Sequence, residues 1–252
     1  MATMLRMLLI LFGLSTLSAS ACAQPRVHGP HVLIFSHSTG YRHASIEPGV
    51  AAFRAMGARA GMHMTASEDP AIFSAEGLRG VDAIILLSNS TRRDDPATEF
   101  FTEAQRAAFQ AFVHRGGGVV AIHAAADSHY RWPWYVRMIG ARFDHHPPGI
   151  PAGTVHVVDP RHQATRGLPA SWSRVDEWYY FDDIDPAMQV LVTLDPASIG
   201  QADFNPNPIS WAHDFEGGRV FYTAMGHTPE SYADPLFLRH VENGLNWVMR
   251  RR

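Results

Sequence analysis

Histidines stand at the ends of three apolar runs in this 252-residue sequence. His37 follows HVLIFS, His123 closes GVVAIH, and His227 comes just after GRVFYTA. An imidazole at the end of a buried strand can act as general base, general acid, metal ligand or hydrogen-bond donor. The alternative for His123 is a core histidine that caps a buried carbonyl. The small residues at 124–126 favour a pocket beside it.

The segment DEWYYF places two adjacent carboxylates, Asp176 and Glu177, before an aromatic run. In a strand, adjacent side chains point to opposite faces, so these two cannot form the facing pair of a glycoside hydrolase. One of them would face a site and the other solvent. Burial beside Trp178 would raise the pKa of a carboxyl group, which suits acid–base work. A structural hydrogen bond to a loop is the alternative.

His123, Glu177 and His227 together have the composition of a two-histidine, one-carboxylate metal site, which would hold a divalent ion such as zinc or manganese. These residues are far apart in the sequence, and no H-E-x-x-H motif is present, so a metal-free site stays open. The adjacent His145 and His146 precede two prolines, and we expect them to shape a loop rim from which one could reach the site.

Other polar and aromatic side chains near the strand ends are candidates for substrate binding. The guanidinium of Arg42 can make a forked contact to a carboxylate or to sugar hydroxyls. Aromatic residues suit core packing and sugar stacking equally well. Because RWPWY is flanked by polar residues and interrupted by proline, we expect it to form a pocket wall. The binding candidates are His37, Thr39, Tyr41, Arg42, His43, Asn89, Asp127, Trp134 and Tyr179.

The hydrophobic patterns predict the elements that would position these residues. In the first half, strands alternate with helices, which predicts a doubly wound parallel sheet that binds ligands beyond the carboxyl ends of its strands. After residue 140 we expect extra strands and long loops on the same sheet, and then a closing helix. The expected strands are 31–36, 61–65, 81–88, 118–123, 154–159, 175–181, 189–194, 209–213 and 219–224, and the expected helices are 48–58, 102–115 and 234–249.

Composition excludes several classes of protein. Cys22 is the single cysteine and all 21 basic residues are arginine, so Schiff-base chemistry on lysine is excluded. The formal net charge of −3 comes with no basic stripe, so nucleic acid is not an expected partner. No G-x-S-x-G motif indicates a serine hydrolase, and no G-x-G-x-x-G motif indicates a dinucleotide site.

The first 23 residues have the pattern of a secretory signal peptide: one positive charge, a short apolar core and small residues before the cleavage site. Cleavage between Ala23 and Gln24 would leave one domain, 24–252, exported to the periplasm or secreted, without cysteine. The apolar core is too short for an ordinary membrane span. A lipoprotein anchored at Cys22 is the alternative.

Four motifs, HSTGYRHASI, GGGVVAIHAAAD, DEWYYF and GRVFYTAMGHTPESY, occur in an order that resembles the ThuA-like (trehalose-utilisation) family. The resemblance runs from about His31 to the C-terminus. It implies a class I glutamine amidotransferase-like, flavodoxin-type fold. His123 would then stand at or next to the position where amidotransferase relatives carry a cysteine, so a cysteine-dependent amidotransferase is excluded. The resemblance also favours Glu177 over Asp176 as the site carboxylate.

The same resemblance implies a small carbohydrate as ligand, such as a disaccharide or its oxidised form. We expect an enzyme that catalyses hydrolysis, elimination or isomerisation. His123 and Glu177 would transfer protons, and His227 would polarise a sugar oxygen with or without a metal. A carbohydrate-binding or sensing protein without turnover is the alternative. The sequence leaves the oligomeric state open.

Overall fold

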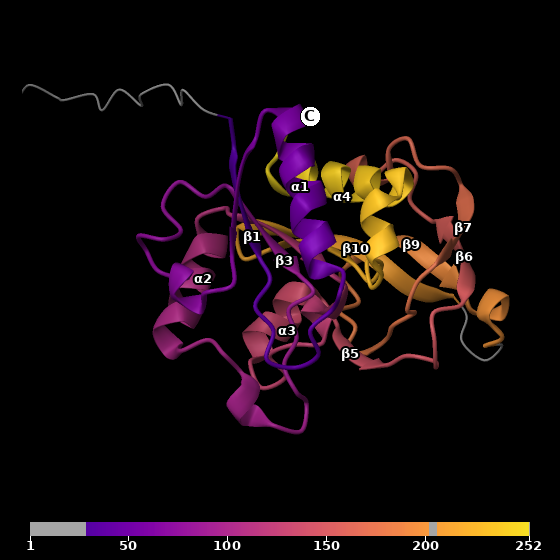
Figure 1. The fold of residues 1–252 in the computed structure, drawn as a ribbon, viewed down its shortest axis with the longest axis horizontal. Coiled ribbons are helices and arrows are strands. Elements are labelled where there is room, and N and C mark those ends of the chain that lie inside the picture. The colour runs from indigo at the N-terminus through magenta and orange to yellow at the C-terminus, as the bar shows by residue number, and fades with distance from the viewer. Residues whose placement is uncertain (1–28, 202–205, 252) are drawn as a thin grey trace, which may run out of the picture.

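The structure is a computed structural model that describes residues 29–201 and 206–251 (Figure 1). The predicted signal segment 1–23 and Cys22 lie outside the described residues. Within the described ranges, nine strands form one sheet in the order β2-β1-β3-β4-β11-β10-β9-β6-β7.

One half of the sheet is parallel. An α-helix follows the first strand and another precedes the fourth, only a short 3-10 turn lies between the second and third, and β11 joins them as a fifth parallel neighbour beside β4. This is the 2-1-3-4-5 order of flavodoxin-like folds, with β11 in the fifth place. The predicted doubly wound α/β class is therefore confirmed. The strands are β1 (His31–Phe35), β2 (His63–Ser67), β3 (Ala83–Leu87), β4 (Gly118–Ile122) and β11 (Gly218–Thr223).

The other half of the sheet is antiparallel and comes from the C-terminal part of the chain, which confirms the extra strands predicted there. A separate two-stranded ribbon pairs β5 with β8. The antiparallel strands are β6 (Ala152–Val157), β7 (Ser171–Val175), β9 (Gln189–Asp195) and β10 (Asn207–Phe215), and the ribbon is formed by β5 (Arg142–His145) and β8 (Tyr180–Asp182).

The predicted strand 175–181 is wrong. β7 ends at Val175, residues 176–179 have no regular structure, and β8 begins at Tyr180. The alternation that would send Asp176 and Glu177 to opposite faces therefore does not apply. The sequence pattern also missed β5 and β7, because RFDH and SWSRV mix polar and apolar residues without a clear period.

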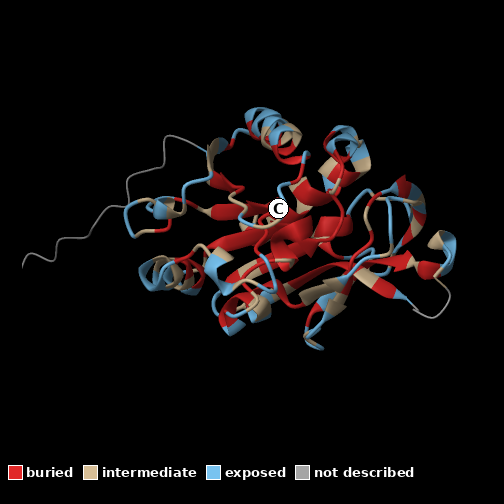
Figure 2. Cartoon of the chain, turned by 60° about the horizontal axis from the view of Figure 1, so that its bottom comes forward, coloured by how far each residue is buried: buried red, intermediate tan, exposed pale blue. Residues whose placement is uncertain are grey.

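Helices cover both faces of the sheet. Figure 1 shows α1 (Ile46–Ala60) beside α4 (Pro235–Val248), and both contact the segment Pro229–Ala233. On the other side, α2 (Glu103–His114) packs its Phe109 ring against Trp134 of α3 (Pro133–Ile139). Burial is concentrated in the central strands, and exposed residues lie on the outward sides of the helices (Figure 2). None of the described helices combines the length and apolarity that a membrane crossing requires.

The parallel pairing has a direct consequence for the site. β1, β3, β4 and β11 run in the same direction, so their carboxyl ends meet at one edge of the sheet. The loops that follow these strands carry His43, Asn89, His123 and His227.

Candidate active site

His123 follows β4 in a strained backbone conformation. Its φ of +50° lies in the left-handed region, which few residues other than glycine adopt. The Tyr222 hydroxyl donates a hydrogen bond to the His123 carbonyl at 2.9 Å and supports this turn. Strain of this kind is common at functional sites. The His123 side chain is fully buried, so it lies beneath the pocket surface.

The orientation of the His123 ring is fixed by a backbone carbonyl. Its Nδ1 lies 2.7 Å from the carbonyl oxygen of Ala224. Because a carbonyl only accepts hydrogen bonds, Nδ1 carries a proton, so in the neutral tautomer Nε2 would offer a lone pair. Nε2 points toward His227 and Glu177.

Three side chains predicted to be catalytic lie together at this edge. Nε2 of His123 is 3.1 Å from Nδ1 of His227 and 3.4 Å from Oε2 of Glu177. Nδ1 of His227 is 3.2 Å from the same carboxylate oxygen. The three atoms form a nearly equilateral triangle, although the residues come from three separate segments of the chain.

His43 is a fourth member of this cluster. Its ring centroid lies 4.8 Å from that of His123 and 5.1 Å from that of His227, with both ring pairs perpendicular. One ligand atom from each of His43, His123, Glu177 and His227 lies within 4.8 Å of the others. His43 is buried, and its Nδ1 makes no hydrogen bond within the described residues. We refer to these four residues as the imidazole cluster.

Asp176 holds the loop that carries His227. Its buried carboxylate accepts hydrogen bonds from the backbone N–H groups of Gly226 at 2.9 Å and His227 at 3.0 Å. The guanidinium of Arg174 lies 2.8 Å from the same carboxylate and balances its charge. The expectation that one of the two adjacent carboxylates faces solvent is therefore wrong. Both turn toward His227, because residues 176–179 leave the sheet.

The surroundings shift the pKa values of the cluster residues in different directions. Burial, together with the neighbouring imidazoles, lowers the pKa of His43 to about 2, so His43 is neutral. Burial alone would raise the pKa of Glu177, but the contacts with His123 and His227 outweigh it and hold that pKa well below its usual value. Burial alone would lower the pKa of His227, but Glu177 raises it above its usual value. Glu177 is therefore ionised.

A pocket of about 500 Å³ opens over the cluster, within the range of small-molecule sites. His43, Glu177 and His227 line it, whereas His123 lies below its floor. The Tyr179 ring packs on His123 with a centroid separation of 4.3 Å. The lining residues are Tyr41, His43, Asp127, Phe143, His146, Gly149, Ile150, Glu177, Tyr179 and His227.

Asp127 adds a second carboxyl group to the pocket wall. Burial raises its pKa to about 7, although a hydrogen bond donated by the Tyr130 hydroxyl opposes the shift. A carboxyl group with this pKa exchanges protons near neutral pH and can act as an acid or as a base.

His146, one of the pair expected at the rim, reaches the site. Its Nε2 lies 3.3 Å from Oε1 of Glu177, and its Nδ1 donates to the Pro147 carbonyl at 2.9 Å. His145 instead pairs with Asp144 at 2.8 Å and stacks on Tyr180.

Three candidates for substrate binding join the strand-end loops to one another and do not line the pocket. The Asn89 side-chain amide donates to the His37 carbonyl at 2.9 Å, and the Thr39 hydroxyl donates to the Thr98 carbonyl. The His37 ring packs edge-on against Phe100. These residues fix the paths of the loops around the pocket.

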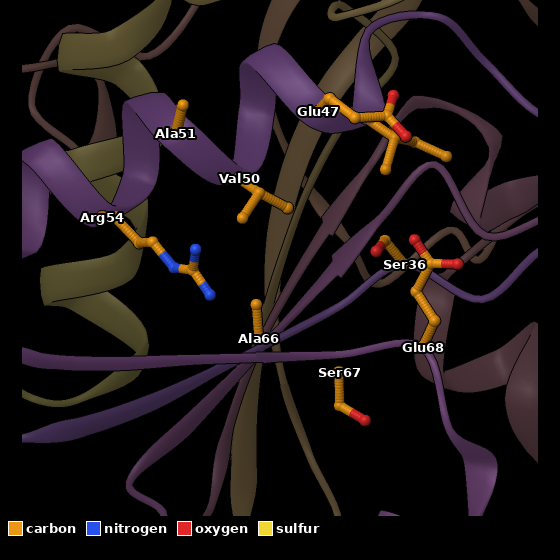
Figure 3. A pocket seen from close by; sticks show the side chains of 9 residues that line it. Ser36, Glu47, Val50, Ala51, Arg54, Ala66, Ser67 and Glu68 are labelled. Carbon is orange, nitrogen blue, oxygen red and sulfur yellow. The ribbon is translucent and has the colours of Figure 1, made fainter.

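Arg42 lies outside the pocket. Its guanidinium contacts Glu47 at 2.6 Å and Glu68 at 2.8 Å in an exposed ion-pair network. Both glutamates line a different pocket of about 410 Å³ between α1 and β2, where Figure 3 shows them beside Ser36. The forked contact expected for Arg42 is therefore made to residues of this chain.

The expected pocket wall at RWPWY is wrong for Trp132 and Trp134. Trp134 is 6% exposed, stacks on Trp132 with a centroid separation of 5.1 Å, and donates a hydrogen bond from Nε1 to Glu216 at 2.7 Å. Pro133 occupies the first turn of α3, where its missing N–H has no cost, so it begins this helix and does not interrupt one. The aromatic rings of Trp132, Trp134 and Tyr135 belong to the core, whereas Arg131 and Pro133 are exposed.

Comparison with known proteins gives three informative results. The sequence model of the ThuA family, described as trehalose utilisation, matches residues 31–248. A putative ThuA-like protein from Bacteroides uniformis is 25% identical, with a TM-score of 0.74, over 87% of this chain and 91% of that one. Another ThuA-like protein, from Parabacteroides merdae, is 18% identical, with a TM-score of 0.65, over 88% of this chain and 90% of that one. At this identity the likeness shows the fold alone. A search of curated proteins found no significant match.

Proposed function

Because the chain belongs to the ThuA family of trehalose utilisation, we propose that it is an exported enzyme that performs acid–base chemistry on a small carbohydrate. The observation that carries this proposal is the convergence of His123, Glu177 and His227, with contacts of 3.1 to 3.4 Å, beneath a pocket that a small sugar would fit. Membership of the family supports a carbohydrate as the substrate, and the side chains of His123, Glu177 and His227 support acid–base chemistry.

The groups that would touch the substrate are Asp127, Glu177 and His227, because these line the pocket. His123 is fully buried and acts through its contacts to Glu177 and His227, so it is a positioning residue. His123, expected from the sequence to transfer protons, would therefore act by positioning Glu177 and His227.

An oxidised sugar with a ketone is the substrate class that suits these groups. A ketone acidifies the neighbouring C–H bond, so a carboxylate or imidazole base is strong enough to remove that proton. The electron pair of the C–H bond then forms an enolate. In an elimination, the enolate expels the oxygen on the next carbon, that C–O bond breaks, and an acid protonates the leaving oxygen. In an isomerisation, the hydroxyl on the deprotonated carbon gives up its proton and becomes the new carbonyl, the former carbonyl oxygen is protonated, and the carbon proton returns to the former carbonyl carbon.

Export is part of the proposal and rests on the sequence of the first 23 residues. Cleavage between Ala23 and Gln24 would give a periplasmic or secreted enzyme that meets its sugar outside the cytoplasm. An anchor at Cys22 would place the same domain at a membrane surface.

The test is turnover of a panel of disaccharides and their keto derivatives, followed by NMR, with purified protein. We expect Glu177→Gln to reduce turnover by about 100-fold or more, the usual range for loss of acid–base catalysis. His123→Ala should also reduce turnover, because Glu177 and His227 would lose the contact that positions them. Trp134→Phe, a conservative change in the core, is the matched control and should keep the wild-type rate. Full turnover in both cluster variants would contradict the proposal. Saturable sugar binding without turnover would favour the binding or sensing alternative.

A further inference from the structure

We propose that His43, His123, Glu177 and His227 bind one divalent transition-metal ion at the floor of the pocket. Metal binding is a property of these four side chains alone, whereas a role for the metal in catalysis rests on the function proposed above. His43 extends the set of two histidines and one carboxylate expected from the sequence to three histidines and one carboxylate.

The distances among three of the four ligand atoms fit a coordination sphere, whereas the full set with His43 spans up to 4.8 Å, so the His43 ring would have to move toward the ion. Zinc binds imidazole nitrogen at about 2.0 to 2.1 Å, so ligands at right angles lie about 3.0 Å apart and tetrahedral ligands about 3.4 Å apart. The three contacts among His123, Glu177 and His227 measure 3.1, 3.2 and 3.4 Å. One ion can therefore bind all three atoms with little movement of the side chains.

The hydrogen bonds around the cluster prepare these atoms to be ligands. The Ala224 carbonyl fixes the proton of His123 on Nδ1 and directs the Nε2 lone pair into the cluster. Ligating histidines almost always donate their other N–H in this way. When His123 is in its neutral tautomer, a single proton between Nδ1 of His227 and Oε2 of Glu177 leaves Nε2 of His123 facing carboxylate lone pairs. A divalent cation would satisfy all three atoms.

Residues around the cluster contact the backbone and the second oxygen atom of two of the proposed ligands. Asp176 fixes the backbone of His227, and His146 contacts the second oxygen of Glu177 at 3.3 Å. Such partners of the ligands are a regular feature of protein metal sites.

The donor set indicates the kind of ion. Imidazole ligands favour zinc, iron, cobalt, nickel or copper, whereas magnesium and calcium prefer oxygen ligands alone. His43, Glu177 and His227 line the pocket, so the open coordination positions would face the space where a sugar would lie. A metal there would polarise a sugar carbonyl as a Lewis acid. Asp127 in the pocket wall would then be the carboxylate left free for proton transfer.

The experiment measures metal binding directly, without any sugar. Protein stripped with a chelator is titrated with zinc by calorimetry, its metal content is measured by mass spectrometry, and the cobalt-loaded form is examined by visible absorption. We expect about one ion per chain. Glu177→Gln, which keeps the shape of the side chain, and His43→Ala and His227→Ala should each weaken binding by about 100-fold or more. His145→Ala, which removes a rim imidazole outside the cluster, is the control and should bind like wild type.

Circular dichroism identifies any variant that fails to fold. If the alanine variants do not fold, zinc binding by Glu177→Gln, which keeps the shape of the side chain, decides the test. No stoichiometric binding by folded wild-type protein would overturn the proposal, as would binding that survives in all cluster variants. Metal bound at the cluster without sugar turnover would support the metal site and contradict the proposed function. Full turnover by the metal-free protein would support the enzyme and contradict a role for the metal in catalysis, whereas the binding measurements alone decide the metal site.

Discussion

At the scale of single residues, the cluster depends on atoms that come from distant parts of the chain. The sequence selected His123 and His227 by their type and their places near strand ends, and the family resemblance favoured Glu177 over Asp176. It could not assign His43 to the cluster, since this depends on the path of the loop between β1 and α1. Nor could it show that the Ala224 carbonyl, 101 residues away, fixes the His123 ring.

Asp127 gives a prediction about stability and pH. Its folded pKa of about 7 lies above the ordinary value of 3.8, so the folded protein binds more protons between these two pH values. The wild type should therefore lose stability as the pH rises from about 4 through about 7. Asp127→Asn cannot lose this proton, so its stability relative to wild type should increase over that range, by at most about 4 kcal/mol.

Urea denaturation at a series of pH values measures this difference. The charged or titratable groups that act on Asp127 are Tyr130, Arg93, Glu177 and His146, and all four remain in the variant. A stability difference that stays constant from pH 4 to 8 would show that Asp127 is ionised throughout.

Asp176 gives a second prediction, about a buried ion pair. Asp176→Asn would leave the Arg174 guanidinium without its closest counter-charge, so we expect a loss of about 3 to 5 kcal/mol in the free energy of unfolding. Asp214→Asn, which breaks an exposed pair with Arg219, should cost no more than about 1 kcal/mol. Equal losses in the two variants would mean that Asp176 is not a structural support.

At the scale of elements, continuous apolar runs predicted the parallel strands well, because both of their faces are covered by helices. The pattern failed at 175–181, where aromatic residues suggested a strand but Asp176 turns inward to bind the loop after β11. It failed again at α3, where the polar residues around the tryptophans hid a core helix. In both places long-range packing overrides the local pattern.

The loop between β11 and the last helix gives a prediction at this scale. Gly226 has a φ of +114°, and a Cβ there would lie 3.0 Å from the Ile122 side chain and 3.1 Å from the Tyr232 hydroxyl. Gly226→Ala should therefore shift the adjacent His227, lower stability and weaken zinc binding. Gly200 also has a positive φ, +78°, but open space around it, so Gly200→Ala should cost about 1 to 2 kcal/mol and leave zinc affinity unchanged.

Zinc titration and urea denaturation of both glycine variants separate the two effects. If Gly226→Ala bound zinc as tightly as Gly200→Ala, the position of His227 would not depend on this loop.

At the scale of the whole molecule, the sheet brings the site together. Parallel strands deliver their loops to one edge, and the antiparallel half extends the sheet toward the segment that carries Asp176 and Glu177. The sequence predicted this architecture from the change in pattern after residue 140. It could not predict the sheet order, because the place of β11 beside β4 is set by packing between residues about 100 positions apart.

The export proposal gives a prediction about the mature chain. Expressed with its own leader in a Gram-negative host, the protein should be recovered from the periplasm with Gln24 as its first residue, as measured by intact mass. A mass that corresponds to a lipid-modified Cys22 would establish the anchored form instead. Recovery of the full chain in the cytoplasm would contradict export.

The central claim is that His43, His123, Glu177 and His227 form one metal centre. The most direct measurement is anomalous X-ray diffraction at the zinc absorption edge from crystals of the zinc-loaded protein. We predict a single strong peak about 2.0 to 2.2 Å from one ligand atom of each of the four side chains. A map without a peak there, or with its main peak at the rim beside His145, would contradict the claim.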